Sequence, residues 1–175
     1  MHGLIFTAFR VFAATEYPAV VDAAWASEPP YLATAAYADE QFEALVDRVA
    51  EFAADSRRTV LRRFGIFAGL STFRLMFPEY YAAHGDTAAF LLEVEEQIHD
   101  VVRTTIPGAA PPRLVVRPLG RDGVSISYTS ERGLCDLLEG LVVGVSRFYG
   151  EVVRIDQPLC MHRGDAACSF FVERA

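Results

Sequence analysis

Apolar side chains recur at three- and four-residue steps through the first third of the chain, which is the spacing of an amphipathic helix. This pattern predicts four helices, and Asp39 stands where a carboxylate can cap the third. The four segments are Gly3–Ala13, Pro18–Trp25, Asp39–Ala54 and Arg57–Phe64. The front of the chain is therefore expected to be rich in α-helix.

A further helix is predicted over Asp86–Thr105, before Pro107–Gly108 ends it. His99 lies on the side of this helix that is expected to face inward, although glutamates crowd around it. The residues that share this side are Ala88, Leu92, Glu95, His99, Val102 and Ile106. The pattern therefore predicts a histidine that faces the interior.

In the last third, apolar and polar residues alternate, which is typical of half-buried strands. Arg113–Leu119 and Val124–Thr129 are predicted to form a hairpin around Gly120–Gly123. The other predicted elements are a helix over Leu134–Phe148 and strands over Glu151–Ile155 and Ala167–Val172. This order favours an α+β fold in which the histidine helix packs against a small antiparallel sheet.

Length and composition favour one domain. A chain of 175 residues with 52% hydrophobic content and 13 Phe can bury one sizeable core, and it is too short to suggest two independent domains. It contains no internal repeat, low-complexity segment or long linker. We therefore expect residues 1–175 to form a single domain.

The charge distribution excludes some classes of partner. A formal net charge of −7 and the absence of a Lys/Arg cluster argue against nucleic-acid and anionic membrane surfaces. No segment reaches the roughly 18 uninterrupted apolar residues of a membrane span, and Arg10 interrupts the N-terminal apolar stretch, unlike a secretory signal. Three cysteines, an odd number, do not indicate a disulfide framework, so we expect a cytoplasmic protein.

Two hydroxyls and a guanidinium follow one another at alternate positions, as Tyr128, Ser130 and Arg132. If the strand stays extended, they share one face with Val124 and Ile126. Arginine pairs with a carboxylate through two hydrogen bonds, and a neutral histidine can ligate iron, so a haem site is one interpretation. An ordinary strand end with a surface arginine is the other.

The spacing of His99, Ile106–Leu114 and Tyr128–Arg132 closely resembles the haem nitric oxide/oxygen binding (H-NOX) family, which includes the haem domain of soluble guanylate cyclase. The likeness extends to Met1–Phe6, to Phe77–Tyr81 and to the helix after Arg132, so it covers nearly the whole chain. It implies a helical distal lobe and a proximal lobe with a small antiparallel sheet, and haem b between them.

The same resemblance implies roles for individual residues. His99 would be the proximal iron ligand, and Tyr128, Ser130 and Arg132 would bind the haem propionates. Residues that match haem-contacting positions of the family are Ile5, Pro112 and Leu141. In the family, nitric oxide lengthens or breaks the bond between histidine and iron, which lets the histidine helix shift against the sheet.

Ligand selectivity depends on hydrogen-bond donors in the distal pocket. Oxygen-binding members place a tyrosine on the helix after the propionate motif, and the matching residue here is Leu137. Phe9 stands where those members have a tryptophan, and no asparagine equivalent occurs around Ala68–Gly69. The resemblance therefore implies a five-coordinate ferrous haem that selects nitric oxide, and also binds carbon monoxide.

The output of such a sensor must pass to another polypeptide. The chain has no kinase, cyclase or DNA-reading signature. It also has no nucleophile elbow, phosphate loop or acid–base pair at a diagnostic spacing, so we do not expect an enzyme. A separate histidine kinase or cyclic-dinucleotide enzyme is the expected partner.

A second constellation lies near the C-terminus: Cys135, Cys160, His162 and Cys168. Thiolates and imidazoles are the ligands that zinc prefers, and these cysteines resemble the zinc-bound cluster of some bacterial H-NOX proteins. The family's histidine falls here near Gln157, so His162 would have to substitute. The spacing is not that of a standard zinc finger, and three reduced, partly buried cysteines are an equal alternative.

One other class of function competes with a haem sensor. Cys160–Phe171 resembles the 4-vinyl reductase domain, a small-molecule-binding module of similar fold. The protein would then be a haem-free small-ligand sensor or a zinc/thiol redox sensor. That alternative leaves the spacing of His99 unexplained.

Overall fold

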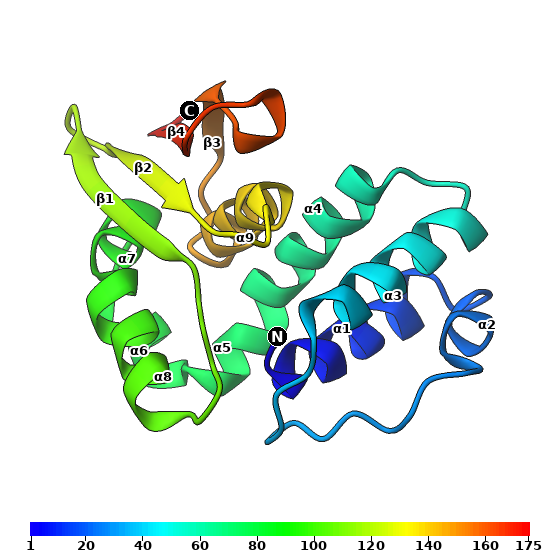
Figure 1. Cartoon of the computed structure of the whole chain (residues 1–175). Coiled ribbons are helices and arrows are strands. Elements are labelled where there is room, and N and C mark those ends of the chain that lie inside the picture. The colour runs from blue at the N-terminus through cyan, green and yellow to red at the C-terminus, as the bar shows by residue number, and fades with distance from the viewer.

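The computed structural model describes all 175 residues. Its first part is a lobe of helices around an aromatic core (Figure 1). Phe9 lies at the centre of this core, with its ring centroid 5.1–5.8 Å from those of four aromatic neighbours, Phe12, Trp25, Phe42 and Phe64. The helices are α1 (Gly3–Glu16), α2 (Val21–Trp25), α3 (Asp39–Phe52) and α4 (Arg57–Phe67). The helical front of the chain is as predicted.

The predicted cap of α3 is wrong. Ala38 is the N-cap residue and Asp39 is the first residue of the helix. The Asp39 carboxylate instead binds the N-terminal amine and the guanidinium of Arg132, which lies 93 residues away in sequence. A cationic partner from another lobe therefore takes the place of the expected bond to the helix backbone.

A helical path follows α4 through six short elements. They are the π-helical turn η1 (Ala68–Thr72), α5 (Phe73–Met76), α6 (Pro78–Ala83), α7 (Thr87–Val94), the π-helical turn η2 (Glu95–His99) and α8 (Asp100–Thr105). The helix predicted over residues 86–105 thus contains a π-turn, in which Asp100 donates its N–H to the carbonyl of Glu95. Such turns are rare and often occur at functional sites.

The buried side of α7 also differs from the prediction. Thr87, Phe90, Leu91 and Val94 are buried, whereas Leu92 is 37% exposed. The inward face is therefore turned by one residue, or about 100°, from the predicted face. Phe90 and Leu91 both contribute to a second hydrophobic core, separate from that of the helical lobe, which makes this the more apolar orientation.

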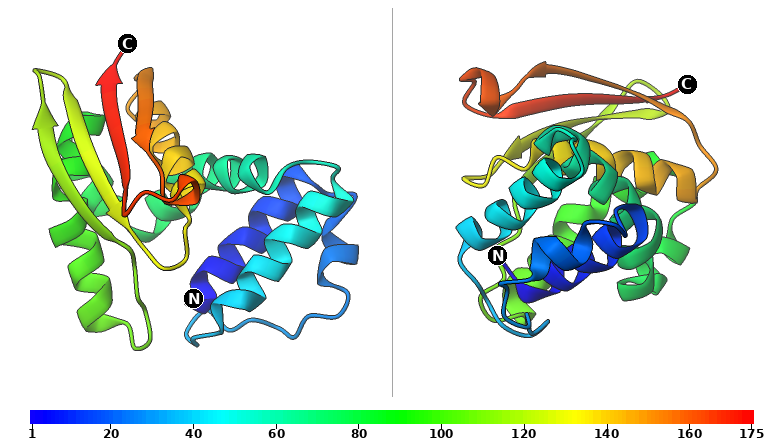
Figure 2. Two further views of the ribbon diagram at one scale, coloured as in Figure 1. Left: turned by 45° about the horizontal axis from the view of Figure 1, so that its top comes forward. Right: turned by 90° about the vertical axis from the view of Figure 1, so that its right-hand side faces the viewer.

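The predicted antiparallel sheet is confirmed, in the order β1-β2-β4-β3 (Figure 2). Its strands are β1 (Arg113–Leu119), β2 (Gly123–Thr129), β3 (Val153–Leu159) and β4 (Cys168–Arg174). A 3-10 turn, η3 (Met161–Arg163), precedes β4. Pro158 lies in β3, which is an edge strand with irregular register, and a proline is tolerated there because its missing N–H need not bond to a neighbour.

Helix α9 (Cys135–Phe148) lies between the lobe and the sheet (Figure 1). Leu137 and Leu141 pack against the helical-lobe core, while Leu138 and Val142 belong to the second core under the sheet. The buried row Val124, Ile126 and Tyr128 of β2 completes that second core, as the alternation predicted. α9 therefore joins two cores.

None of the helices has both the length and the apolar content needed to cross a bilayer.

Helices α4 and α9 cross at very short range. A Cβ atom added to Gly140 would lie 2.1 Å from the carbonyl oxygen of Arg62, and one added to Gly65 would lie 2.3 Å from that of Leu137. Only glycine permits this backbone approach, since any side chain would overlap the facing helix. The crossing fixes where the apolar side chains of α9 lie.

Candidate functional site

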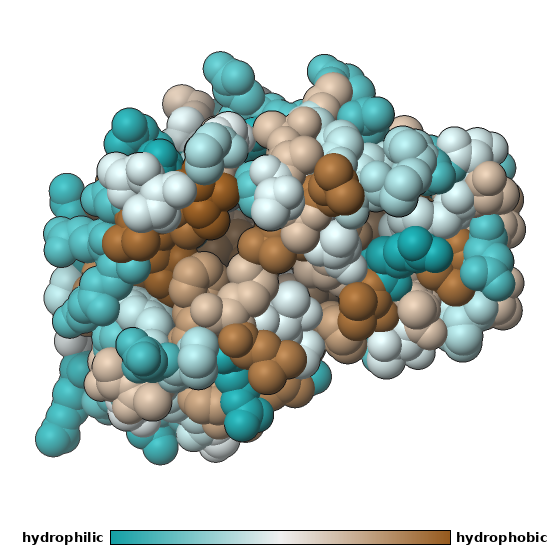
Figure 3. All heavy atoms as spheres, turned by 90° about the horizontal axis from the view of Figure 1, so that it is seen from below, coloured by the Kyte–Doolittle hydropathy of each residue, from teal (hydrophilic) through white to brown (hydrophobic).

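A cavity of about 240 Å³ lies between the two cores. Of its 29 lining residues, 23 are hydrophobic, so it favours a ligand with a large apolar surface. Figure 3 shows hydrophobic side chains around a hollow on the underside of the molecule. The residues come from both lobes, so a ligand there would touch α1 and α9 as well as the histidine helix.

His99 lines this cavity from the end of η2. Its Nδ1 lies 2.9 Å from Oε2 of Glu95, and because a carboxylate can only accept, Nδ1 is the donor. Burial lowers the pKa of His99, against the opposing effect of Glu95, so the ring is neutral near pH 7. A neutral ring that donates from Nδ1 keeps the lone pair of Nε2 for a metal.

Glu95 is the centre of a network that the sequence did not reveal. Its Oε2 also accepts the backbone N–H of Leu114 at 3.1 Å, and its Oε1 accepts from Arg103. Arg103 donates further to the carbonyl of Pro112 and to Asp100. The histidine helix is therefore tied to the start of β1 through a carboxylate that contacts His99 directly.

Tyr128, Ser130 and Arg132 form a polar end of the cavity. The chain does not stay extended, as the predicted row required: β2 ends at Thr129, and a turn follows in which Gly133 donates to the carbonyl of Ser130. Ser130 and Arg132 still line the cavity after this turn. The backbone N–H of Arg132 donates to the Ser130 hydroxyl oxygen at 3.3 Å. The Tyr128 hydroxyl accepts the N–H of Leu134 at 3.0 Å, and burial raises its pKa.

The guanidinium of Arg132 donates to Oδ2 of Asp39 at 2.8 Å and to the carbonyl of Ala110. Burial would raise the pKa of Asp39, but the hydrogen bonds from Arg132 and from the N-terminal amine lower it overall. Arg132 is thus a partly buried cation at the rim of an apolar cavity, held between two lobes. Sequence reasoning missed Asp39 because the pairing joins residues far apart in the chain.

The opposite wall is apolar. Ile5, Leu137 and Leu141 line it, and Pro112 lines the cavity near the start of β1. Phe9 does not line the cavity, since its ring is enclosed in the helical-lobe core.

Two further polar side chains at the cavity were not predicted to lie there. The hydroxyl of Tyr81 donates to the carbonyl of Gly69 at 2.7 Å, so its proton is already used. His2 lines the cavity with a buried Nε2 that has no hydrogen-bond partner. His2 is therefore the other imidazole that a cavity ligand could meet.

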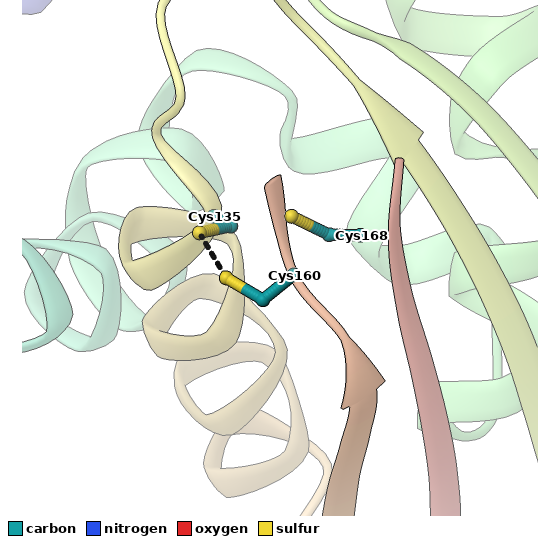
Figure 4. Close-up of side chains that lie close together, drawn as sticks. All are labelled: Cys135, Cys160 and Cys168. Atoms are coloured by element: carbon teal, nitrogen blue, oxygen red, sulfur yellow. Dashed lines mark hydrogen bonds between the residues drawn. The ribbon is translucent and has the colours of Figure 1, made fainter. Parts of the chain in front are cut away.

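The three cysteines meet away from the cavity, where α9 approaches β3 and β4 (Figure 4). Their sulfur atoms lie within 4.8 Å of one another, and those of Cys135 and Cys160 are 3.8 Å apart. Burial raises the pKa of the Cys135 thiol and that of Cys168. The predicted convergence of the cysteines therefore occurs in the fold.

His162 occupies a different side of this cluster. Its ring groups with Cys135 and Asp136, and its Nε2 lies 2.7 Å from the carbonyl of Gly133. It does not form a common group with all three thiols in this arrangement. Gln157, at the position that matches the family histidine, has a buried amide nitrogen without a partner.

Comparison with known proteins agrees with this geometry. The chain is similar over its whole length to an H-NOX protein from S. oneidensis in the Fe(II)NO ligation state, with a TM-score of 0.91, 20% identity and 99% of that chain covered. An Fe(II) unliganded H-NOX protein from K. algicida gives a TM-score of 0.88 at 20% identity, with 100% of this chain and 97% of that one covered. At these identities the likeness establishes the fold. No curated protein matched significantly.

A match to a family model establishes the family as well as the fold. The model described as haem-NO-binding matches residues 2–157, which include every lining residue of the cavity except Met1, with His99 and the turn after β2 among them. The residues also fit a haem on physical grounds, because the cavity combines apolar walls, a neutral, partly buried imidazole and a cationic rim. The chain belongs to the haem-NO-binding family, whose members are H-NOX haem gas-sensor domains.

Proposed function

We propose that this chain is a nitric-oxide-selective haem sensor, with His99 as the only protein ligand of a five-coordinate ferrous haem b. The observation that carries the proposal is the pairing of a neutral His99 with an apolar opposite wall in one cavity. Ferrous haem supplies an iron that binds small gases on the side away from the histidine. We propose further that residues 1–175 act as a single domain, because α9 belongs to both cores.

Each predicted site residue that lines the cavity has a role in this proposal, and Phe9, which does not line it, has none. His99 offers Nε2 to the iron, and Glu95 holds the ring by Nδ1. Ile5, Pro112, Leu137 and Leu141 supply apolar contacts for the porphyrin. A neutral ring is essential to this role, because a protonated imidazole has no lone pair to offer.

The haem carboxylates would bind at the polar end. Arg132 can form two parallel hydrogen bonds with a carboxylate, and Ser130 and Tyr128 add hydroxyl donors beside it. The guanidinium of Arg132 already donates to the carboxylate of Asp39 in this position, which supports a carboxylate as its partner. A propionate would share or replace that pairing.

Selectivity follows from the missing donor at Leu137, the family's donor position; His2 is the remaining candidate donor at the cavity, because its Nε2 has no partner. Bound oxygen carries negative charge and is held by a hydrogen bond, whereas nitric oxide and carbon monoxide bind ferrous iron without one. Leu137 supplies no donor, and the proton of Tyr81 is bound to a carbonyl. The cavity therefore favours nitric oxide and carbon monoxide over oxygen.

The test of this function is the absorption spectrum of the reduced, haem-loaded protein in nitric oxide, carbon monoxide or air. We expect complexes with the first two gases and no stable oxygen complex. Leu137→Tyr supplies a hydroxyl at the family's donor position, and a hydrogen bond to a charged acceptor is worth about 1.5 to 3 kcal/mol. We therefore expect oxygen affinity to rise by about ten- to a hundredfold if the phenol is well oriented.

Leu137→Phe is the matched control, because it adds the ring without the hydroxyl. A stable oxygen complex in the unmodified protein would contradict the selectivity. His2 would then be the donor to remove, because its Nε2 is buried without a partner.

The signal would pass to a separate protein, and we propose a histidine kinase or a cyclic-dinucleotide enzyme in the cytoplasm. The supporting observation is the bond from Glu95 to the N–H of Leu114, which joins the His99 turn to β1. Weakening of the bond between His99 and iron would free this turn to move against the sheet. The free, buried cysteines favour a reducing compartment.

We also propose a structural zinc site at the cysteine cluster. Ligand sulfurs in a tetrahedral site with zinc–sulfur bonds of about 2.3 Å lie roughly 3.8 Å apart, which equals the separation of Cys135 and Cys160. Cys168 would be the third ligand. His162 would need to break its bond to Gly133 to become the fourth.

Metal analysis after purification under reducing conditions tests this site. We expect about one zinc per chain, and a lower melting temperature after chelation, because thiolate zinc sites contribute folding energy directly. His162→Ala removes only the proposed fourth ligand. Zinc retention should therefore be weakened but not abolished. If folded protein contains no zinc and all three cysteines are alkylated freely, the zinc site is wrong and the cysteines are reduced thiols.

A further inference from the structure

The carboxylate of Glu95 is held by donors from three segments. His99 donates from η2, Leu114 donates a backbone N–H from β1, and Arg103 donates from α8. The Glu95 side chain is only 21% exposed. A surface pair four residues apart on a helix is usually mobile, but this carboxylate is fixed from outside its own turn.

The charge of this carboxylate has a chemical effect on the ring. A histidine that donates from one nitrogen to a carboxylate becomes a stronger electron donor at the other nitrogen. Hydrogen bonds to a charged acceptor are roughly twice as strong as those between neutral groups. Arg103 acts in the opposite direction, because its cation is shared with Glu95 and withdraws negative charge from it.

We propose that Glu95 is a positioning residue that strengthens the bond between His99 and iron, and that Arg103 limits this strengthening. The inference rests on the proposed function, since it requires His99 to be the ligand. Nitric oxide would then meet a firmer iron–histidine bond than it would without Glu95. The pair Glu95 and Arg103 would thus set how readily the sensor releases its histidine.

The direct measurement is the iron–histidine stretching frequency of the reduced, gas-free protein by resonance Raman spectroscopy. Glu95→Gln keeps a hydrogen-bond acceptor but removes the charge, so the frequency should fall. Arg103→Gln removes the competing cation, so the frequency should rise. Glu96→Gln is the matched control, because Glu96 lies in the same turn, is exposed and has no bond to His99.

A second readout uses the same variants. With nitric oxide bound, the fraction of protein that keeps its histidine should be lower in Glu95→Gln than in the wild type, and higher in Arg103→Gln. Loss of a residue that orients a metal ligand typically costs about 10- to 100-fold in metal affinity. Haem transfer to apomyoglobin should therefore be faster by roughly that factor in Glu95→Gln.

The possible results distinguish a wrong role for Glu95 from a wrong assignment of His99 as the iron ligand. An unchanged frequency in Glu95→Gln, or shifts of the same direction in both variants, would overturn the role of Glu95 while leaving His99 as the ligand. If Glu95→Gln does not retain haem, the test relies on Arg103→Gln alone. An iron–histidine stretching frequency that does not rise in Arg103→Gln would then overturn the inference. A wild-type protein without an iron–histidine band would overturn the proposed function, and this inference with it.

Discussion

Replacing His99 with glycine is expected to leave the chain almost free of haem, and adding imidazole is expected to restore binding. His99 is the imidazole whose pKa burial lowers and whose Nδ1 is fixed by a carboxylate, so its Nε2 is preset as a ligand. The glycine variant leaves a space that free imidazole can enter. Haem content after purification, with and without imidazole, measures both effects.

Two other histidines provide the controls. His84 is held by the carbonyl of Tyr80 and by Glu93, and does not line the cavity, so His84→Ala should keep its haem. His2 also lines the cavity, but its Nδ1 accepts the N–H of Leu4, so its Nε2 carries a proton that must leave before it could bind iron, and His2→Ala should keep its haem. Loss of haem in His2→Ala together with full retention in His99→Gly would reverse the assignment.

The second large effect is expected at the helix crossing. In Gly140→Ala the new Cβ would lie 2.1 Å from the carbonyl oxygen of Arg62, so α9 must move away from α4. Overpacking of this kind costs about 1–3 kcal/mol, and for a chain of this size each kcal/mol lowers the melting temperature by roughly 2–4 °C. We therefore expect a fall of about 2–12 °C by thermal unfolding, although alanine is the better helix former.

Gly85→Ala is the matched control, because its Cβ would meet nothing within 4 Å. Its melting temperature should change little. A Gly140→Ala protein as stable as the wild type would show that α9 can shift without cost. The apolar wall formed by Leu137 and Leu141 would then be less rigid than the crossing indicates.

Local patterns were sufficient for most of the fold. The row Val124, Ile126 and Tyr128 is buried as the alternation predicted, because a strand with one covered face must alternate. The helices of the front lobe follow their apolar spacing for the same reason. Within the long central helix the predicted inward side is correct for His99, Val102 and Ile106, which line the cavity. It fails before the π-turn at Glu95–His99, where Leu91 and Val94 are buried in place of the predicted positions.

The sequence predicted the candidate site only at positions that match the motif spacing of the family. His99, Tyr128, Ser130 and Arg132 are on one cavity, as the resemblance led us to expect. Phe9 is not, because its ring is more fully buried in the aromatic core. The spacing alone could not distinguish a cavity wall from the core behind it.

The polar partners could not be predicted, because they depend on contacts between distant segments. Asp39 and Arg132 pair across 93 positions, and Glu95 binds Leu114 on a strand. In sequence, Glu95 was the glutamate on the same side of the helix as His99, but nothing there indicated its bonds to Leu114 and Arg103. A carboxylate four residues before a histidine on a helix is a weak clue, and only the fold shows which acceptor reaches the ring.

The cavity between the two cores is expected to hold haem on His99. The most direct test is to add ferric haem to the purified wild-type protein, reduce it, and record the absorption spectrum with the amount of haem bound per chain. We predict about one haem per chain and the spectrum of a five-coordinate, histidine-ligated ferrous haem. A folded protein that takes up no haem, or whose haem spectrum is the same in His99→Gly, would contradict the claim.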